Sequence, residues 1–248
     1  MPSDTSTEPS PLFAARMAGA LWLIVILASI GAVIGGTSLD LHGDPETLVA
    51  NTVTAASSIR LTFALFFFGK VCYMGVTVLL CQLLKPVNKS VALFGAFCGV
   101  AGLLSGGFGH INLLTALSLL DESRRAAEPV AGQLQGAAKI LLSTAPRFSG
   151  EDVWFGGQIL SVGYLIARSA FLPRAIGALL VLAGSCFLIT SFTSFVSPAL
   201  GNRLATVLLP IVLLGEASLA LWLVARGVNV EQWRWTRARS STFAPAAR

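Results

Sequence analysis

One apolar stretch, from Leu204 to Arg226, constrains the fold of this chain more than any other feature. It reads LATVLLPIVLLGEASLALWLVAR, and a run of about twenty apolar residues is the length that a helix needs to cross a bilayer. One acid, Glu216, lies near its middle. Because a charged side chain is costly at that depth, Glu216 must be paired, protonated or functional. The stretch therefore predicts a membrane-spanning helix with a polar group in the hydrocarbon core.

The composition extends this interpretation to the whole chain. Of the 248 residues, 54% are hydrophobic and only 12% are charged, whereas soluble domains are about a quarter charged. A chain this apolar predicts lipid as its solvent and an all-α, polytopic transmembrane bundle of about six spans. We expect residues 13–227 to form a single transmembrane domain. A disordered polar segment, 1–12, precedes it, and a basic Trp/Arg-rich cytoplasmic tail, 228–248, follows it.

The third of the six expected spans is rich in glycine. Its pairs Gly95/Gly99 and Gly102/Gly106 have the small-xxx-small spacing that lets two helix backbones approach closely in lipid. We therefore place this helix centrally, and the same stripe favours a homo-oligomer formed through the third span. The expected spans are residues 17–36, 59–84, 91–120, 154–167, 175–196 and 204–226.

The long loop after the third span, residues 121–152, contains an amphipathic pattern. Val130, Leu134, Ala137 and Leu141 follow one helical face. The prolines at 129 and 146 suit the start and the stop of a helix. The loop therefore predicts a helix that lies on the outer leaflet or caps the bundle, because it is too short and too polar to span the membrane.

The net charge of +5 is distributed in loops and tail rather than in one patch, which argues against nucleic acid as a partner. Basic residues in short loops mark the cytoplasmic side and suit an anionic lipid surface. With six spans both termini share a side, so we expect both in the cytoplasm. The basic residues that then lie inside include Arg16, Lys85, Lys89, Arg168, Arg174 and Arg226.

Neither a metal site nor a cofactor is predicted. The four cysteines lie in apolar runs and form no Cys-x-x-Cys pair, so they are expected to be buried hydrophobic residues. His42 lies among acids in the loop after the first span, but no ligand spacing repeats there. The glycine clusters lack the strand context that a dinucleotide site requires.

The candidate site rests on polar groups at similar depth. Lys70 and Glu216 lie eleven and twelve residues from the outer ends of their spans, and His110 lies close to that level. One hypothesis is a structural Lys70–Glu216 pair, in which each charge relieves the desolvation cost of the other. The second is a proton or substrate site built from Glu216, His110 and Lys70, with Tyr73 and Asn112 as further candidate ligand contacts. In the third, the three groups never meet.

Three functions follow from these groups. The leading interpretation is a protein that binds or moves a small lipophilic or weakly charged solute. The alternative is an intramembrane enzyme of the isomerase or cyclase type, acting on a lipid-like substrate. In that enzyme Glu216 would be the catalytic acid or base, since removal from water favours the protonated form of a carboxyl group. The third is a structural or accessory membrane subunit.

The chain resembles an uncharacterised family of small bacterial multi-pass membrane proteins, the domain of unknown function 4386. The resemblance implies a helical bundle of the bacterial inner membrane and makes Gly215-Glu216 a family-like feature, but it implies no activity. Members of that family often carry acids in the second span, at places where this chain has Phe66 and Tyr73, with Lys70 between them. The segments that carry the resemblance are ARMAGALWL (14–22), LLKPVNKSVAL (83–93), FGGQILSVGYLIARSAFLPRAIGALLVLAG (155–184) and GEASLALWLVARGVN (215–229).

Overall fold

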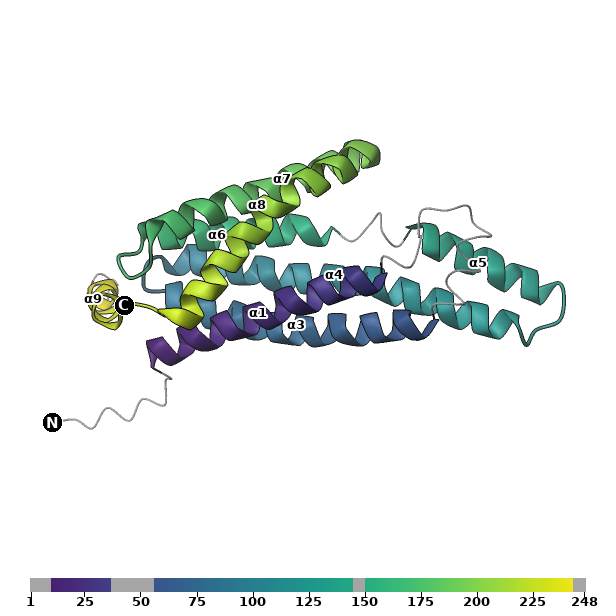
Figure 1. The fold of residues 1–248 in the computed structure, drawn as a ribbon, viewed down its shortest axis with the longest axis horizontal. Coiled ribbons are helices and arrows are strands. Elements are labelled where there is room, and N and C mark those ends of the chain that lie inside the picture. Colours follow the sequence, from purple (N-terminus) through teal and green to yellow (C-terminus); the bar gives the residue numbers. More distant parts are fainter. Residues whose placement is uncertain (1–9, 37–55, 145–149, 243–248) are drawn as a thin grey trace, which may run out of the picture.

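The computed structural model describes residues 10–36, 56–144 and 150–242, and within these ranges every regular element is a helix. The prediction of an all-α polytopic bundle is therefore confirmed. The predicted loop around His42 lies outside the described residues. The helices are α1 (Pro11–Gly36), α3 (Ala56–Leu84), α4 (Lys89–Ser123), α5 (Val130–Thr144), α6 (Glu151–Arg168), α7 (Arg174–Val196), α8 (Pro198–Ala225) and α9 (Val230–Thr242) (Figure 1).

Six of the helices pack as a closed ring. In the order α1, α3, α4, α6, α7 and α8, each helix contacts the next, and α8 contacts α1 again. Figure 1 shows α1, α3 and α4 running together along the bundle, while the α7–α8 pair diverges from them towards one end. The first turn of α1 and the last turn of α8 lie at the opposite end.

Five of the described helices are long and apolar enough to cross a membrane, which supports an integral membrane protein. The sixth helix of the ring, α6, is shorter and more polar. Its 18 residues reach about 27 Å, close to the roughly 30 Å of a hydrocarbon core. Because α4 and α7 flank it, α6 can carry polar side chains along the bundle. The five spanning segments are Pro11–Gly31, Phe63–Leu84, Lys89–Phe108, Arg174–Val196 and Pro198–Ala225.

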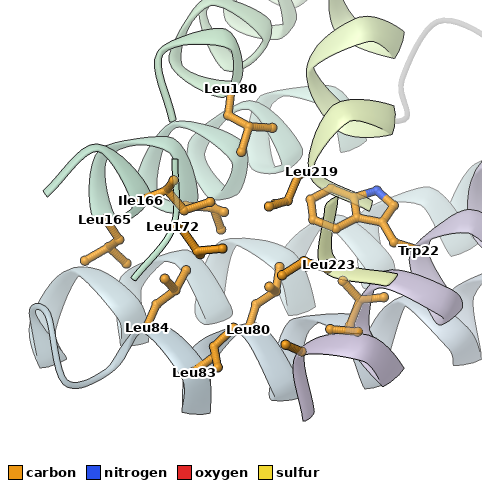
Figure 2. Packing of buried hydrophobic residues seen from close by; sticks show 14 of the residues in the cluster. Trp22, Leu80, Leu83, Leu84, Leu165, Ile166, Leu172, Leu180, Leu219 and Leu223 are labelled. Atoms are coloured by element: carbon orange, nitrogen blue, oxygen red, sulfur yellow. The ribbon is translucent and has the colours of Figure 1, made fainter. Parts of the chain in front are cut away.

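The main core fills the half of the bundle near the first turn of α1. Leu80, Leu219 and Leu223 interdigitate there with Trp22, which is 1% exposed (Figure 2). The opposite surface of the same helices is also apolar. Phe97 is 63% exposed and Leu27 is 67% exposed. Large apolar side chains on the outside are expected where lipid is the solvent.

The glycine stripe of α4 faces α6 of the same chain. A methyl group at Gly99 would lie 2.6 Å from the side chain of Gln158, and one at Gly102 would lie 2.8 Å from the ring of Phe155. On the other side of α6, a methyl group at Gly177 of α7 would lie 2.6 Å from the backbone of Ala167. The small-residue spacing therefore brings helices together within one chain. The predicted homo-oligomer stays a prediction, and it needs a different face of α4.

At the end where α7 and α8 diverge, α4 continues past its spanning segment and pairs with α5 (Figure 1). The predicted helix in this loop is present, but its predicted buried face is wrong. Val130 is 49% exposed and Ala137 is also exposed. The buried positions are Ala131, Ala138 and Leu142. Of these, Ala138 and Leu142 pack on Ala116 and Leu120 of α4, with half-buried Leu141 beside them. The hydrophobic periodicity of the sequence gives weight to large residues, whereas the facing alanines Ala138 and Ala116 let α5 and α4 approach most closely.

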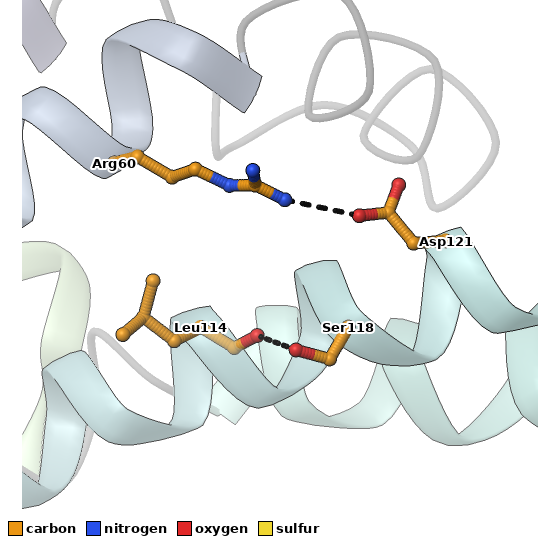
Figure 3. Close-up of polar contacts among 4 residues, drawn as sticks. All are labelled: Arg60, Leu114, Ser118 and Asp121. Carbon is orange, nitrogen blue, oxygen red and sulfur yellow. Dashed lines mark hydrogen bonds and ion pairs between the residues drawn. The ribbon is translucent and has the colours of Figure 1, made fainter.

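One ion pair connects α3 to this α4–α5 hairpin. The guanidinium of Arg60 lies 3.1 Å from the carboxylate of Asp121, and Ser118 on α4 donates to the carbonyl oxygen of Leu114 at 3.1 Å (Figure 3). The two ionic side chains are 65% and 45% exposed. An exposed pair of this kind contributes about 0–1 kcal/mol. It positions the hairpin rather than holding the bundle together.

The two ends of the bundle differ in charge. We call the end with the first turn of α1 the basic end and the end with α5 the hairpin end. Among the described residues, Glu231 is the acid at the basic end, whereas Asp121, Glu122 and Glu128 lie at the hairpin end. The exposed cations of the basic end are Arg16, Lys85, Lys89, Arg168, Arg174, Arg226, Arg234, Arg237 and Arg239.

This asymmetry predicts the orientation in the membrane. Since basic loops are retained in the cytoplasm, reporter fusions after Pro86 and at the C-terminus should both read cytoplasmic. A reporter inserted within residues 124–128 should read external. An external reading at the C-terminus would contradict both the orientation and the role of α6 as a full traverse of the bundle.

The packing of α5 gives a second prediction. Leu142→Ala should loosen the hairpin by about 2 kcal/mol, because it empties a buried site. Ile140→Ala, at a position that is 65% exposed, is the matched control and should change little. Hydrogen exchange of the α5 amides measures the difference. Equal exchange in the two variants would contradict the buried face assigned here.

Candidate functional site

Three aromatic rings from three helices pack at the middle of the bundle. The ring centroids of Trp22 and Tyr73 are 6.2 Å apart with an interplanar angle of 88°, and those of Tyr73 and Phe155 are 5.0 Å apart at 66°. Edge-to-face packing of this kind adds to the stability that burial provides. Tyr73 lies about 16 Å along α3 from its end at Leu84, near the middle of a core roughly 30 Å thick. We call these three rings the aromatic layer.

A buried amide lies directly against the aromatic layer on α6. The hydroxyl of Tyr73 donates to Oε1 of Gln158 at 2.9 Å, and Nε2 of Gln158 donates to Oγ1 of Thr77 at 3.1 Å. Gln158 and Thr77 are each 2% exposed. A polar group this deep requires partners, and the space beside Gly99 lets the Gln158 side chain fit between α4 and α6.

A small cavity extends from Gln158 towards the basic end. Its walls come from α3, α4 and α6, and they include Thr77, Cys81, Ala92 and Ser161. About 10 Å³ of it is open to the centre of a water-sized molecule, which is close to the space for one water. The polar wall at Thr77, Gln158 and Ser161 supplies the partners that such a water would need.

Glu216 lies beside the aromatic layer on α8. The indole Nε1 of Trp22 donates to its Oε2 at 3.4 Å. A methyl group at Gly215 would lie 2.9 Å from Ala183, so this glycine lets α8 pack tightly against α7. Among the described residues, no cation lies within ion-pair distance of the Glu216 carboxyl group. It is half-buried and has one hydrogen-bond donor, which is the arrangement of a group that can accept a further partner.

Lys70 has a different partner from the one that its depth suggested. Its ammonium group forms an ion pair with Glu151, the first residue of α6, and lies 4.4 Å from the ring centroid of Phe66 and 4.9 Å from that of Phe155. The Lys70 and Glu151 side chains are only 16% and 14% exposed. The hypothesis of a Lys70–Glu216 pair is therefore wrong. The sequence predicts a loop at Glu151, but Glu151 begins a helix, where an acid is also favoured by the helix dipole.

The structure brings some of the predicted site residues together. Tyr73 belongs to the aromatic layer, and Glu216 and Lys70 border it, with Trp22 between Tyr73 and Glu216. Asn112 is half-buried on α4, beyond the spanning segment that ends at Phe108. His110 belongs to the same part of α4, but its side chain lies outside the described part of the structure.

Sequence reasoning missed the contribution of α6. Glu151, Phe155, Gln158 and Ser161 face Gly106, Gly102, Gly99 and Gly95 in turn. Glu151, Phe155 and Gln158 are spaced four and three residues apart, as are Gly106, Gly102 and Gly99, and this match was the signal that could have identified them. Asp152 was also missed, although its carboxyl group is within electrostatic reach of both Lys70 and Glu216.

The site contains more acid than base. Among the described residues, the carboxyl groups of Glu151 and Asp152 lie near the ammonium group of Lys70, and Asp152 is also within electrostatic reach of Glu216. Within the described ranges, no three His, Cys, Asp or Glu side chains are placed to hold a metal ion. The arrangement can bind a polar group next to aromatic walls, and it can donate or accept a proton at Glu216.

The Lys70–Glu151 pair makes a testable prediction. Lys70→Met and Glu151→Gln should each lower the free energy of unfolding by about 3 kcal/mol, because each leaves a partly buried charge unpaired. The double variant should recover at least about 1 kcal/mol. Lys70→Met combined with Glu216→Gln is the control, and its effects should add to within about 0.5 kcal/mol. Thermal unfolding in detergent measures both double-mutant cycles, Lys70 with Glu151 and Lys70 with Glu216. Coupling of Lys70 to Glu216 rather than to Glu151 would overturn the assignment.

Comparison with known proteins places these residues in a family. The family described as Domain of unknown function (DUF4386) matches residues 17–227, which is most of the chain and includes the aromatic layer, Gln158 and Glu216. No curated protein and no solved structure matches the chain. The chain therefore belongs to the DUF4386 family of domains of unknown function.

Proposed function

We propose that this membrane protein binds and moves a small lipophilic or weakly charged solute, which contacts Glu216 beside the aromatic layer. One observation carries the proposal: polar groups lie on both sides of the aromatic layer. The carboxyl groups of Glu151 and Asp152 lie towards the hairpin end, and the amide of Gln158 borders the cavity towards the basic end. A protein with a purely structural core would fill this depth with apolar side chains.

Access of a solute from the hairpin end is supported by the way the α7–α8 pair diverges from α1, α3 and α4 towards that end (Figure 1). The halves of α1 and α8 nearest that end are poorly covered by other helices. Leu27 on α1 is 67% exposed, and Val207 and Leu209 on α8 are 69% and 52% exposed. A lipophilic solute can therefore approach Glu216 from the hydrocarbon core without crossing a layer of charged groups.

Closure towards the basic end is supported by the rings themselves. Trp22 is 1% exposed and Tyr73 is 7% exposed, so the aromatic layer separates Glu216 from the cavity at Gln158. Movement of a solute past this layer requires the rings to separate. Pro210 lies inside α8, fewer than two turns before Glu216, and a proline removes one backbone hydrogen bond from a helix. A bend of α8 at that position is the movement that would open the layer.

The second candidate is an intramembrane enzyme acting on a lipid-like substrate. It is favoured by the carboxyl group of Asp152, which is within electrostatic reach of Glu216. Two acids held in different environments can act as general acid and general base. An enzyme would release a chemically changed product, whereas a carrier would release the solute unchanged on the other side.

Uptake into proteoliposomes tests the proposal. A panel of radiolabelled hydrophobic solutes (a weak base, a weak acid and a neutral compound) should include at least one that the native chain transports. Glu216→Gln should lower the uptake of that solute at least about tenfold, a loss of roughly 1.4 kcal/mol, while thermal unfolding changes little. Ser218→Ala is the matched control, since this half-buried hydroxyl on the same helix only donates back to the carbonyl oxygen of Gly215.

Three outcomes decide between the candidates. Loss of uptake in Glu216→Gln but not in Ser218→Ala supports a carrier. A converted solute, recovered by chromatography and mass spectrometry, supports the enzyme. Native uptake in Glu216→Gln would contradict a role for this carboxyl group in either function.

A further inference from the structure

We propose that α9 and the neighbouring turns of the basic end form a binding surface for the headgroups of anionic phospholipids. This surface is independent of the proposed solute site, which lies about 16 Å deeper along α3. It rests on four observations: how α9 is held, how it is oriented, which side chains it exposes, and which charges surround it.

The position of α9 is fixed by hydrogen bonds to the bundle. The indole Nε1 of Trp233, which is 9% exposed, donates to the carbonyl oxygen of Leu83 at 2.9 Å. Leu83 is in the last turn of α3, where carbonyl groups have no partner within the helix. The backbone N–H of Asn229 donates to the carbonyl oxygen of Phe171 at 3.2 Å, and the Asn229 side chain caps α9 by accepting from Gln232 at 3.1 Å.

These bonds place α9 at the depth of the headgroups. The spanning segment of α3 ends at Leu84, one residue from the carbonyl group that Trp233 contacts. Figure 1 shows α9 end-on beside the basic end while the bundle runs across the picture, so α9 lies across the bundle axis and along the membrane plane. A helix about 10 Å wide at this level overlaps the polar layer, which adds roughly 5–7 Å to each side of the hydrocarbon core.

The side chains that α9 exposes suit phosphate groups at a membrane interface. Arg234, Arg237 and Arg239 are exposed, and Trp235 is 59% exposed. The guanidinium of Arg239 lies 4.5 Å from the ring centroid of Trp235. Tryptophan is favoured at membrane interfaces, and guanidinium groups bind phosphate through paired hydrogen bonds. Glu231 is the acid within α9, so the helix carries a net positive charge.

Charge complementarity extends beyond α9. Lys85, Arg168 and Arg226 are exposed on the turns and helix ends that border it, and the described acids at this end are limited to Glu231. Each basic residue near an anionic leaflet strengthens binding about fivefold. The bundle already spans a membrane, so phospholipid headgroups surround this end wherever the protein is folded. A soluble polyanion would not account for a largely exposed tryptophan next to the arginines.

Native mass spectrometry of the full chain in a non-ionic detergent tests the proposal. The probes are phosphatidylglycerol and phosphatidylcholine, added in equal amounts. The native chain should retain phosphatidylglycerol in preference to phosphatidylcholine. The variant with Arg234→Gln, Arg237→Gln and Arg239→Gln should lose that preference, by on the order of a hundredfold in affinity. The matched control carries Arg124→Gln, Arg125→Gln and Arg203→Gln, which remove three exposed cations at the hairpin end and should leave the preference intact.

A second measurement uses the native sequence. Brominated phosphatidylglycerol should quench tryptophan emission more strongly than brominated phosphatidylcholine does. Trp235→Phe should remove that difference, whereas Trp154→Phe should keep it. Quenching should weaken in high salt, because screening reduces attraction to exposed charges.

Several results would overturn the proposal. An equal preference for phosphatidylglycerol in the α9 variant and the native chain would exclude α9 as the surface. An equal loss in the control variant would mean that only the net charge of the protein matters. Displacement of the lipid by free glycerol phosphate at the same concentration would indicate a simple phosphate site. If the α9 variant does not fold, the quenching measurement decides the question. A difference between brominated phosphatidylglycerol and brominated phosphatidylcholine that persists in the folded Trp235→Phe chain would also exclude α9 as the surface.

Discussion

The close packing of α6 between α4 and α7 is the contact on which the rest of this structure depends. Helices in lipid gain no hydrophobic free energy by associating, because lipid chains are as apolar as the side chains that face them. They associate where backbones can approach closely. Glycines on α4 and α7 remove the side chains that would keep α6 away. A helix with acids at its start and an amide at its centre can therefore run through the middle of a membrane protein.

The register of α6 follows from the same contact, and the candidate site follows from the register. The side chain that enters beside Gly99 is Gln158, which brings its amide to Tyr73. One turn away, Phe155 lies beside Gly102 and completes the aromatic layer. At the end of α6, Glu151 reaches Lys70. Since Lys70 is already paired with Glu151, the indole of Trp22 is the one partner of the Glu216 carboxyl group among the described residues.

Depth along a helix could be predicted from this sequence, but the direction of a side chain around the helix could not. Apolar runs identified the membrane-spanning helices, and counting residues placed Lys70 and Glu216 at nearly the same level. In lipid, however, the face towards the core and the face towards the solvent are both apolar, so periodicity does not distinguish them. This is why the Lys70 pair was assigned to the wrong acid. The buried face of α5 was wrong for a related reason, because small facing residues carry little weight in a hydrophobic pattern.

The glycine stripe also limits how this chain can diverge over evolutionary time. Gly95, Gly99, Gly102 and Gly106 on α4 each face one side chain of α6, so a side chain gained on one helix must be matched by volume lost on the other. Gly99 could become alanine in a descendant whose residue 158 is smaller, but the amide that reaches Tyr73 would then be lost. Neutral drift at the four positions of α4 is thus tied to change at α6. Substitutions on these two helices should arise in pairs, one at a position of α4 and one at the position of α6 that faces it.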